Sequence, residues 1–290
     1  MENYHNWLLE EKTSFLKLVR EILMFREWST KKQLSEDDLQ RISKAFDIAA
    51  NCHHSDKPRD SWDPYITHPI AVARILLQEF QDTNVNQILV ALLHDTVESN
   101  PQSKKIINKE LWKVIAKHVL AISKKDPTHY LSFKEKVSFR IQDLVDKIFS
   151  QCLHILIHVK RPVDIVSPER KILYKKLKIK RDHDYFSWLD RLHYDELCVK
   201  IADRLHNLRT IQGCDTEKQR GTTEGTHTYF LHVVKSRCPN ELDLLVEELC
   251  HIDKNNVKKK VNNFLMSNGV DPRSFYEGNM DNKVLSKKKS

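Results

Sequence analysis

Residues 91–99, Ala-Leu-Leu-His-Asp-Thr-Val-Glu-Ser, carry side chains whose types and spacing suit metal-assisted chemistry. The adjacent His94 and Asp95 end an apolar run, Glu98 follows at helical spacing from both, and Ser99 lies four residues after Asp95. On one continuous helix these side chains share a face. One imidazole nitrogen and two or three oxygens that converge on a point suit a hard or borderline divalent metal with a water beside it.

A second group of polar side chains lies on the predicted helix 194–212. Asp203, Asn207 and Thr210 occupy positions i, i+4 and i+7, so they form a line along one side of that helix. A carboxylate, an amide and a hydroxyl in line suit a bound ligand. They suit a solvated face equally well, because two neighbouring arginines could pair with Asp203 in water. The spacing alone favours neither interpretation.

Other histidines in the chain are weaker candidates for chemistry. A second His-Asp pair at 183–184 lies in a charged run without an apolar helix around it, which indicates a surface position. His154 and His158 have the i, i+4 spacing of some metal-binding helices, but their neighbours are aliphatic and no carboxylate completes a set. The adjacent His53 and His54 cannot share a helix face, which favours structural roles.

The elements that must position these residues are predicted to be helices. With only 5 Gly and 9 Pro in 290 residues, a turn-rich all-β fold is disfavoured. Apolar residues recur at helical spacing, so we expect an all-α protein. The predicted helices are 7–26, Leu39–His53 after a cap by Ser35 and Asp38, Pro69–Leu77, 86–98, 106–122, 133–150, 194–212, 228–236 and 240–265.

Loops are expected at 54–64 and 216–226, where turn-forming residues gather, and Gly213 is expected to end the helix before it. The segment 152–159 fits a helix or a strand. We find no internal repeat and no low-complexity linker that would separate independent domains.

The bulk composition limits the class of protein and its partners. The net charge of +8 favours anionic partners, yet acidic residues are interspersed, so the basic cluster at 175–181 and the lysines at 287–289 fit a solvated surface and a tail better than a nucleic-acid site. No apolar run of 18 residues predicts a membrane span, and the first residues lack the pattern of a secretory signal. Six dispersed cysteines without a C-x-x-C pair indicate free thiols in a reducing cytoplasm and argue against a zinc-thiolate site.

Three motifs in series carry a resemblance to a known family. Residues 64–69 (PYITHP), 91–98 (ALLHDTVE) and 199–210 (VKIADRLHNLRT) resemble the hydrolase domain of the RelA/SpoT homologue family, a branch of the HD-domain metal-dependent phosphohydrolases. Residues 229–235 resemble the end of that domain, and the match runs from about 40 to about 250. The resemblance implies an all-α HD-domain helical bundle. Without a motif of the synthetase domain, we expect a small, hydrolase-only alarmone hydrolase.

The resemblance also implies a metal centre. His68, His94, Asp95 and Asp203 match the four metal ligands of the family, whose metal is usually Mn²⁺, and another divalent ion would suit the same donors. Such an ion lowers the pKa of its bound water and neutralises charge on a pyrophosphate.

Further roles follow from the same resemblance. Glu98 matches the first acid of a catalytic Glu-Asp pair, and Asn207 and Thr210 match residues that line the nucleotide pocket. Arg59 roughly matches a basic residue that contacts the base. The chain departs from the family where Ser99 replaces the second acid, because a serine can hold a water but cannot act as a carboxylate base.

A second departure concerns length. The segment between the second and third motifs is about forty residues longer than the small hydrolases lead us to expect, and we place an insertion around 125–190 as a lid, an interface or a partner site. We therefore expect a helical extension at 1–40, a hydrolase domain at 41–265 and a partly disordered tail at 266–290.

Three functions remain open from the sequence. The first is metal-dependent hydrolysis of the 3′-pyrophosphate of guanosine tetra- or pentaphosphate, (p)ppGpp, to GDP or GTP and pyrophosphate. The second is hydrolysis of another nucleotide, which the altered 54–64 loop motivates. The third is a nucleotide-binding or regulatory module with impaired catalysis, which Ser99 motivates. A small guanine nucleotide is the expected partner, no membrane is expected, and the oligomeric state stays open, a homo-oligomer included.

Overall fold

The structure is a computed structural model. It describes residues 2–30, 34–58, 63–80, 83–124, 188–252, 266–267 and short stretches between 131 and 184. The chain divides into two compact units, of which the first combines residues 1–122 and 192–290 and the second comprises 123–191. These limits lie close to those of the insertion predicted from the sequence. His154, His158 and the segment 152–159 lie outside the described residues, as do His183, Arg59 and most of the predicted helix 133–150 and of the tail.

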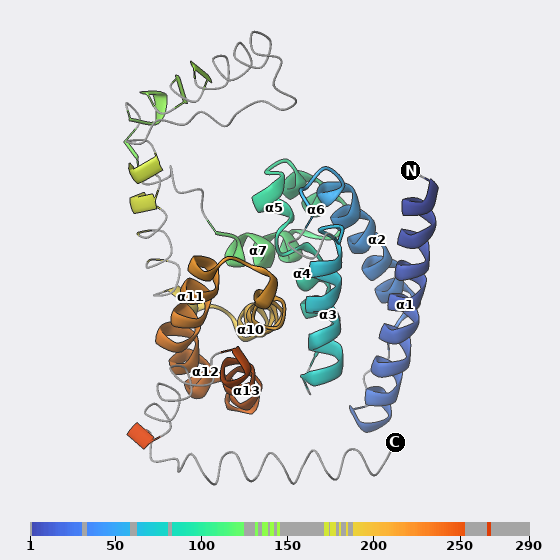
Figure 1. Cartoon of the computed structure of the whole chain (residues 1–290). Coiled ribbons are helices and arrows are strands. Elements are labelled where there is room, and N and C mark those ends of the chain that lie inside the picture. Colours follow the sequence, from blue (N-terminus) through green and yellow to red (C-terminus); the bar gives the residue numbers. More distant parts are fainter. Residues whose placement is uncertain are drawn as a thin grey trace. The chain divides into compact units, whose positions relative to one another are not determined.

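The described part of the first unit is built from helices, which confirms the all-α prediction (Figure 1). The α-helices are α1 (Glu2–Thr30), α2 (Glu36–His53), α3 (Thr67–Glu79), α4 (Val85–Leu93), α5 (Thr96–Ser99), α6 (Ser103–Glu110), α7 (Lys113–Ile122), α10 (Tyr194–Arg209), α11 (Thr216–Gly225), α12 (Leu231–Arg237) and α13 (Leu242–Ile252). Single turns at Ile211–Gly213, Thr226–Phe230 and Pro239–Glu241 connect the last four. No described helix combines the length and the apolar character needed to cross a membrane.

Helix α4 forms the centre of this unit. Its residues from Gln87 to Leu93 are all buried, which is typical of a helix that is apolar all round and covered on every side. It packs against α2, α3, α7 and α10. A capping box between Asn84 and Gln87 begins the helix, and both amides also donate to Oδ1 of Asp195, at 3.1 and 3.0 Å. The beginnings of α4 and α10 are thereby tied together.

Helices α3 and α10 pack against each other and against α4. Arg209, at the end of α10, donates two hydrogen bonds to the Glu79 carboxylate of α3 at 2.6 and 2.8 Å. Its Nε donates to Glu248 of α13 at 2.8 Å. A fork of this kind fixes orientation as well as distance, so one guanidinium sets the angles among three helices.

Helix α1 packs along α2 and α3 on the outer side of the unit (Figure 1). Phe15 and Val19 are fully buried, and the Phe15 ring lies 6.2 Å from that of Phe46 in α2. The predicted cap of α2 is confirmed, because the Ser35 side chain accepts from the Asp38 amide and the Asp38 carboxylate accepts in return from the Ser35 amide.

Two predicted helices are interrupted in the structure. The prediction of one helix over 86–98 is wrong, because α4 ends at Leu93 and α5 begins at Thr96. The prediction of a helix over 106–122 is also wrong, since α6 and α7 are separated at Trp112, whose φ of 93° lies in the left-handed region. The Arg41 guanidinium lies 3.6 Å from the centre of the Trp112 ring, a stacked contact that holds this residue in a conformation costly for a non-glycine.

The predicted loop at 216–226 is a helix instead. Asp215 caps α11 by accepting a hydrogen bond from the Lys218 amide at 2.8 Å, and Thr223 and Thr226 are buried. A Cβ added at Gly221 would meet nothing within 4 Å, so this glycine is tolerated rather than required. Capping and burial outweigh the turn preference of the polar residues here.

Candidate metal centre

Helix α4 ends where His94 follows it, and this end fixes the imidazole. His94 Nδ1 donates a hydrogen bond to the carbonyl oxygen of Ala91 at 2.8 Å. In the neutral ring, Nε2 then presents its lone pair to the interior. Thr96 Oγ1 donates to the carbonyl oxygen of Leu93 at 2.6 Å. Side chains therefore occupy two carbonyls of the last turn, which competes with continuation of the helix.

Asp95 occupies the turn between α4 and α5, with φ −97° and ψ −7°. Its Oδ2 accepts a hydrogen bond from the Tyr65 hydroxyl at 2.6 Å and lies 3.2 Å from His94 Nε2. The Asp95 side chain is 17% exposed whereas that of His94 is 0% exposed. The carboxylate therefore lies on the solvent side of the buried imidazole.

His68 lies in the first turn of α3 and is also buried. Its Nδ1 lies 2.8 Å from Nδ1 of His206 in α10, so one of the two rings donates to the other. Metal-binding histidines commonly use their second nitrogen in this way, which fixes the ring plane and the tautomer. Nε2 of His68 is thereby directed toward His94, at 3.2 Å from its Nε2.

Asp203 comes from α10, and its two oxygens have different partners. Oδ1 accepts from Asn207 Nδ2 at 2.7 Å, and Oδ2 accepts from Lys200 Nζ at 2.6 Å. The Lys200 side chain is 4% exposed and that of Asp203 is 14% exposed. A lysine is rarely this deeply buried without a paired charge, so the ion pair accounts for its position.

The four side chains converge on one point. His68 Nε2 lies 3.5 Å from Asp95 Oδ2 and 3.3 Å from Asp203 Oδ1, and His94 Nε2 lies 3.9 Å from the same Asp203 oxygen. Ligands bound to one ion at roughly 2.0–2.2 Å are about 3 Å apart when they are adjacent. His68, His94 and Asp95 also form a group in which one ligand atom of each lies within 4.8 Å of the others. Two nitrogens and two oxygens so arranged fit a divalent cation.

The charges of the group shift the pKa values of its members. Burial alone lowers the pKa of His94, but the Asp95 and Asp203 carboxylates outweigh it and raise this pKa to about 8. Burial likewise tends to raise the pKa of Asp95, and the adjacent His94 outweighs it, so this pKa is lowered. For Asp203, Lys200 is the main cause that overcomes burial and lowers the pKa. Burial dominates at His68 and lowers its pKa. Both carboxylates are therefore ionised and ready to bind a cation.

Of the other residues predicted for the site, Asn207 contacts one of the four converging side chains. Asn207 reaches the centre through its hydrogen bond to Asp203, whereas the Thr210 hydroxyl donates back to the carbonyl oxygen of His206 and Thr210 is exposed. Glu98 and Ser99 are exposed on α5. Arg59 lies outside the described residues.

Some residues of the centre are missing from the sequence prediction. Lys200 and His206 are three residues before and after Asp203, so helical spacing places all three on neighbouring positions of one face. Tyr65 lies within the 64–69 motif, three residues before His68. Spacing was a usable signal for these three. It gives no indication of Asp56, which contacts Ser99 only through the tertiary fold.

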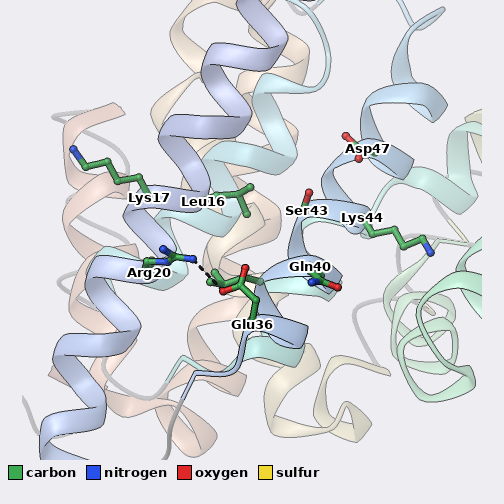
Figure 2. A pocket seen from close by; sticks show the side chains of 9 residues that line it. Leu16, Lys17, Arg20, Glu36, Gln40, Ser43, Lys44 and Asp47 are labelled. Atoms are coloured by element: carbon green, nitrogen blue, oxygen red, sulfur yellow. Dashed lines mark hydrogen bonds and ion pairs between the residues drawn. The ribbon is translucent and has the colours of Figure 1, made fainter.

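A separate cavity of about 560 Å³ lies between α1 and α2 (Figure 2). Its charged residues are largely neutralised within the protein, since Arg20 pairs with Glu36, and Asp47 with Lys12. The candidate metal-binding side chains come instead from α3, the α4–α5 turn and α10.

Comparison with known proteins points to one family, although no family model matches the chain. The bifunctional (p)ppGpp synthase/hydrolase SpoT of Escherichia coli K12 is 27% identical over 236 residues, covering 79% of this chain and 27% of that protein. The guanosine-3′,5′-bis(diphosphate) 3′-pyrophosphohydrolase of Haemophilus influenzae is 25% identical over 222 residues, covering 75% of this chain and 26% of that protein. The chain thus spans about a quarter of the length of these curated relatives.

A solved structure shares the fold. It is described as "A metazoan ortholog of SpoT hydrolyzes ppGpp and plays a role in starvation responses", and it matches with a TM-score of 0.50 and 18% identity over 76% of this chain and 97% of that chain. The described part of the chain is all-α, as the prediction requires, and shares its fold with that structure. Over about three quarters of its length, the chain is therefore similar in sequence to these (p)ppGpp hydrolases.

Proposed function

We propose that this protein hydrolyses the 3′-pyrophosphate of (p)ppGpp and releases GDP or GTP and pyrophosphate. The observation that carries this proposal is the convergence of His68, His94, Asp95 and Asp203 in a chain whose relatives are named as (p)ppGpp hydrolases. We infer that these four residues hold the metal and that the metal is Mn²⁺. A bound divalent ion supplies an acidified water and neutralises phosphate charge.

The residues of the chain divide the remaining tasks. Hydrolysis forms a bond from water oxygen to the phosphorus attached to the 3′ oxygen, breaks that phosphorus–oxygen ester bond, and returns a proton to the 3′ oxygen. Glu98, exposed on α5, is proposed to position or deprotonate the attacking water. Lys200, His206 and Tyr65 hold three of the metal-binding side chains through the hydrogen bonds described above.

The nucleotide pocket is proposed to lie beside this centre. Asn207 lies one turn after Asp203 on α10, and Thr210 follows the end of that helix. Both are proposed to line the nucleotide pocket, and Arg59 is proposed to contact the base. We propose that the reaction takes place in the cytoplasm, because the cysteines within the described residues are free thiols, as is usual in a reducing compartment.

One assay tests the proposal. Purified protein is incubated with Mn²⁺ and, in separate reactions, guanosine tetraphosphate, NADPH or nucleoside triphosphates, beside His94→Ala and the control His251→Ala, whose side chain is 66% exposed on α13. We expect turnover of the tetraphosphate by wild type and control and none by His94→Ala. Turnover of another nucleotide alone would show that (p)ppGpp is not the substrate and would identify that nucleotide in its place. Binding without turnover would favour the regulatory module that Ser99 motivates.

A direct measurement of metal content tests the site independently of activity. Wild type is expected to hold about one ion per chain, as four converging donors imply, and His94→Ala is expected to lose it. Wild type that binds no stoichiometric metal would refute the assignment of the centre.

A further inference from the structure

A carboxylate from another part of the chain lies directly against Ser99. Asp56 follows the end of α2, and its Oδ2 accepts a hydrogen bond from Ser99 Oγ at 2.9 Å. The same oxygen lies 2.7 Å from His53 Nδ1, and an ionised carboxylate can only accept, so the histidine donates. Two donors thus hold one oxygen of Asp56 beside α5.

This group is continuous with the metal centre. The His53 ring lies 4.7 Å from the ring of Tyr65, and the Tyr65 hydroxyl donates to Asp95 at 2.6 Å. One aromatic side chain therefore separates the Asp56 group from a proposed metal ligand. The contacts between α2 and α5 bring the two parts of the chain together.

The free atoms of the group are suited to a water or a substrate. Asp56 is 27% exposed, and within the described part of the chain its Oδ1 makes no hydrogen bond. The buried Nε2 of His53 also lacks a partner among the described residues. A histidine buried for structural reasons alone normally satisfies both nitrogens, so this unpaired nitrogen points to a group that the chain does not supply.

We propose that Asp56 is a catalytic carboxylate of this centre, which works with Glu98 on the attacking water while His53 and Ser99 hold it in place. The acid expected at position 99 is thereby supplied by the residues that follow α2. In the reaction, a proton of the attacking water passes to the Asp56 carboxylate as the water oxygen bonds to phosphorus. That proton then leaves for the 3′ oxygen of the departing nucleotide, so Asp56 returns to its ionised state. This inference rests on the proposed hydrolysis.

Relocation of the carboxylate tests it. Wild type, Asp56→Asn, Ser99→Asp and the double variant are assayed with guanosine tetraphosphate and Mn²⁺. Asp37→Asn, at an exposed position of α2, is the control. We expect Asp56→Asn to lower kcat about 100-fold with little change in KM, metal content or melting temperature. Ser99→Asp alone should gain nothing, because its carboxylate would face Asp56 at hydrogen-bonding distance and the two would repel.

The double variant provides the decisive comparison. It carries one carboxylate at 99 and an amide at 56, and we expect it to recover at least about tenfold in kcat over Asp56→Asn, a change of about 1.4 kcal/mol. Wild-type kcat in Asp56→Asn would overturn the inference and leave the proposed function intact. A loss in Asp56→Asn that Ser99→Asp does not reverse would show a structural role and overturn it also. A wild type without turnover would overturn both proposals.

Discussion

Replacement of Lys200 by methionine isolates the electrostatics of the centre. The Lys200 ammonium lies 2.6 Å from Asp203 Oδ2, and the two side chains are only 4% and 14% exposed. Methionine conserves most of the buried length and removes the charge. Removing one partner of a buried pair costs about 3–5 kcal/mol, because the other charge stays buried. In a chain of this size we expect a fall in melting temperature of about 10 °C for the metal-free protein.

The metal should reverse part of this loss. In the variant, a divalent ion neutralises the Asp203 carboxylate and is not repelled by the Lys200 ammonium. We therefore expect Lys200→Met to bind Mn²⁺ about tenfold more tightly than wild type, a gain of about 1.4 kcal/mol in binding free energy. Saturating Mn²⁺ then raises the melting temperature more in Lys200→Met than in wild type.

Thermal denaturation with and without Mn²⁺, together with calorimetric titration of the ion, measures both effects. Lys105→Met, at an exposed position of α6, controls for the change of residue type. Equal destabilisation with and without metal, or weaker binding by Lys200→Met, would refute the argument that this ammonium and the ion share one carboxylate.

Two further predictions concern pH and packing. The pKa of His94 is raised to about 8 from 6.5, so its contribution to the stability of the metal-free protein is complete below pH 6.5 and is lost as the pH rises through 8. Urea denaturation should record a loss of about 2 kcal/mol in the free energy of unfolding over that interval. A His94→Gln variant whose free energy of unfolding depends on pH in the same way would contradict this cause. The lowered pKa of His68 affects stability only below pH 6.5. Arg209→Lys, which loses the fork to Glu79 and Glu248, should cost about 1–2 kcal/mol in the same measurement, and wild-type stability would show that the fork is not required.

The predictable part of the fold is the part in which local signals agree. The apolar run of α4 and the cap formed by Ser35 and Asp38 are predicted from the sequence and are present in the structure. The break between α4 and α5 cannot be predicted from the sequence, because it arises when the His94 and Thr96 side chains donate to backbone carbonyls that would otherwise accept helical hydrogen bonds. The left-handed backbone at Trp112 cannot be predicted either, because no glycine is present there and a stacked arginine from α2 stabilises the conformation.

The candidate site shows the same division. Short spacing links His94 to Asp95, and the family resemblance adds His68 and Asp203, which lie on other helices. Asp56 could not be predicted, because no periodicity connects it to Ser99, and their hydrogen bond exists only when the end of α2 packs against α5.

The interruption of the first unit by residues 123–191 has a consequence for the entropy of folding. Helix α10 must return to α3 and α4 across a connection of nearly seventy residues. Closure entropy grows only with the logarithm of length, so this connection disfavours docking by only about 2 kcal/mol more than a ten-residue linker would. The length of this connection therefore adds little to the free-energy cost of bringing α10 against α3 and α4.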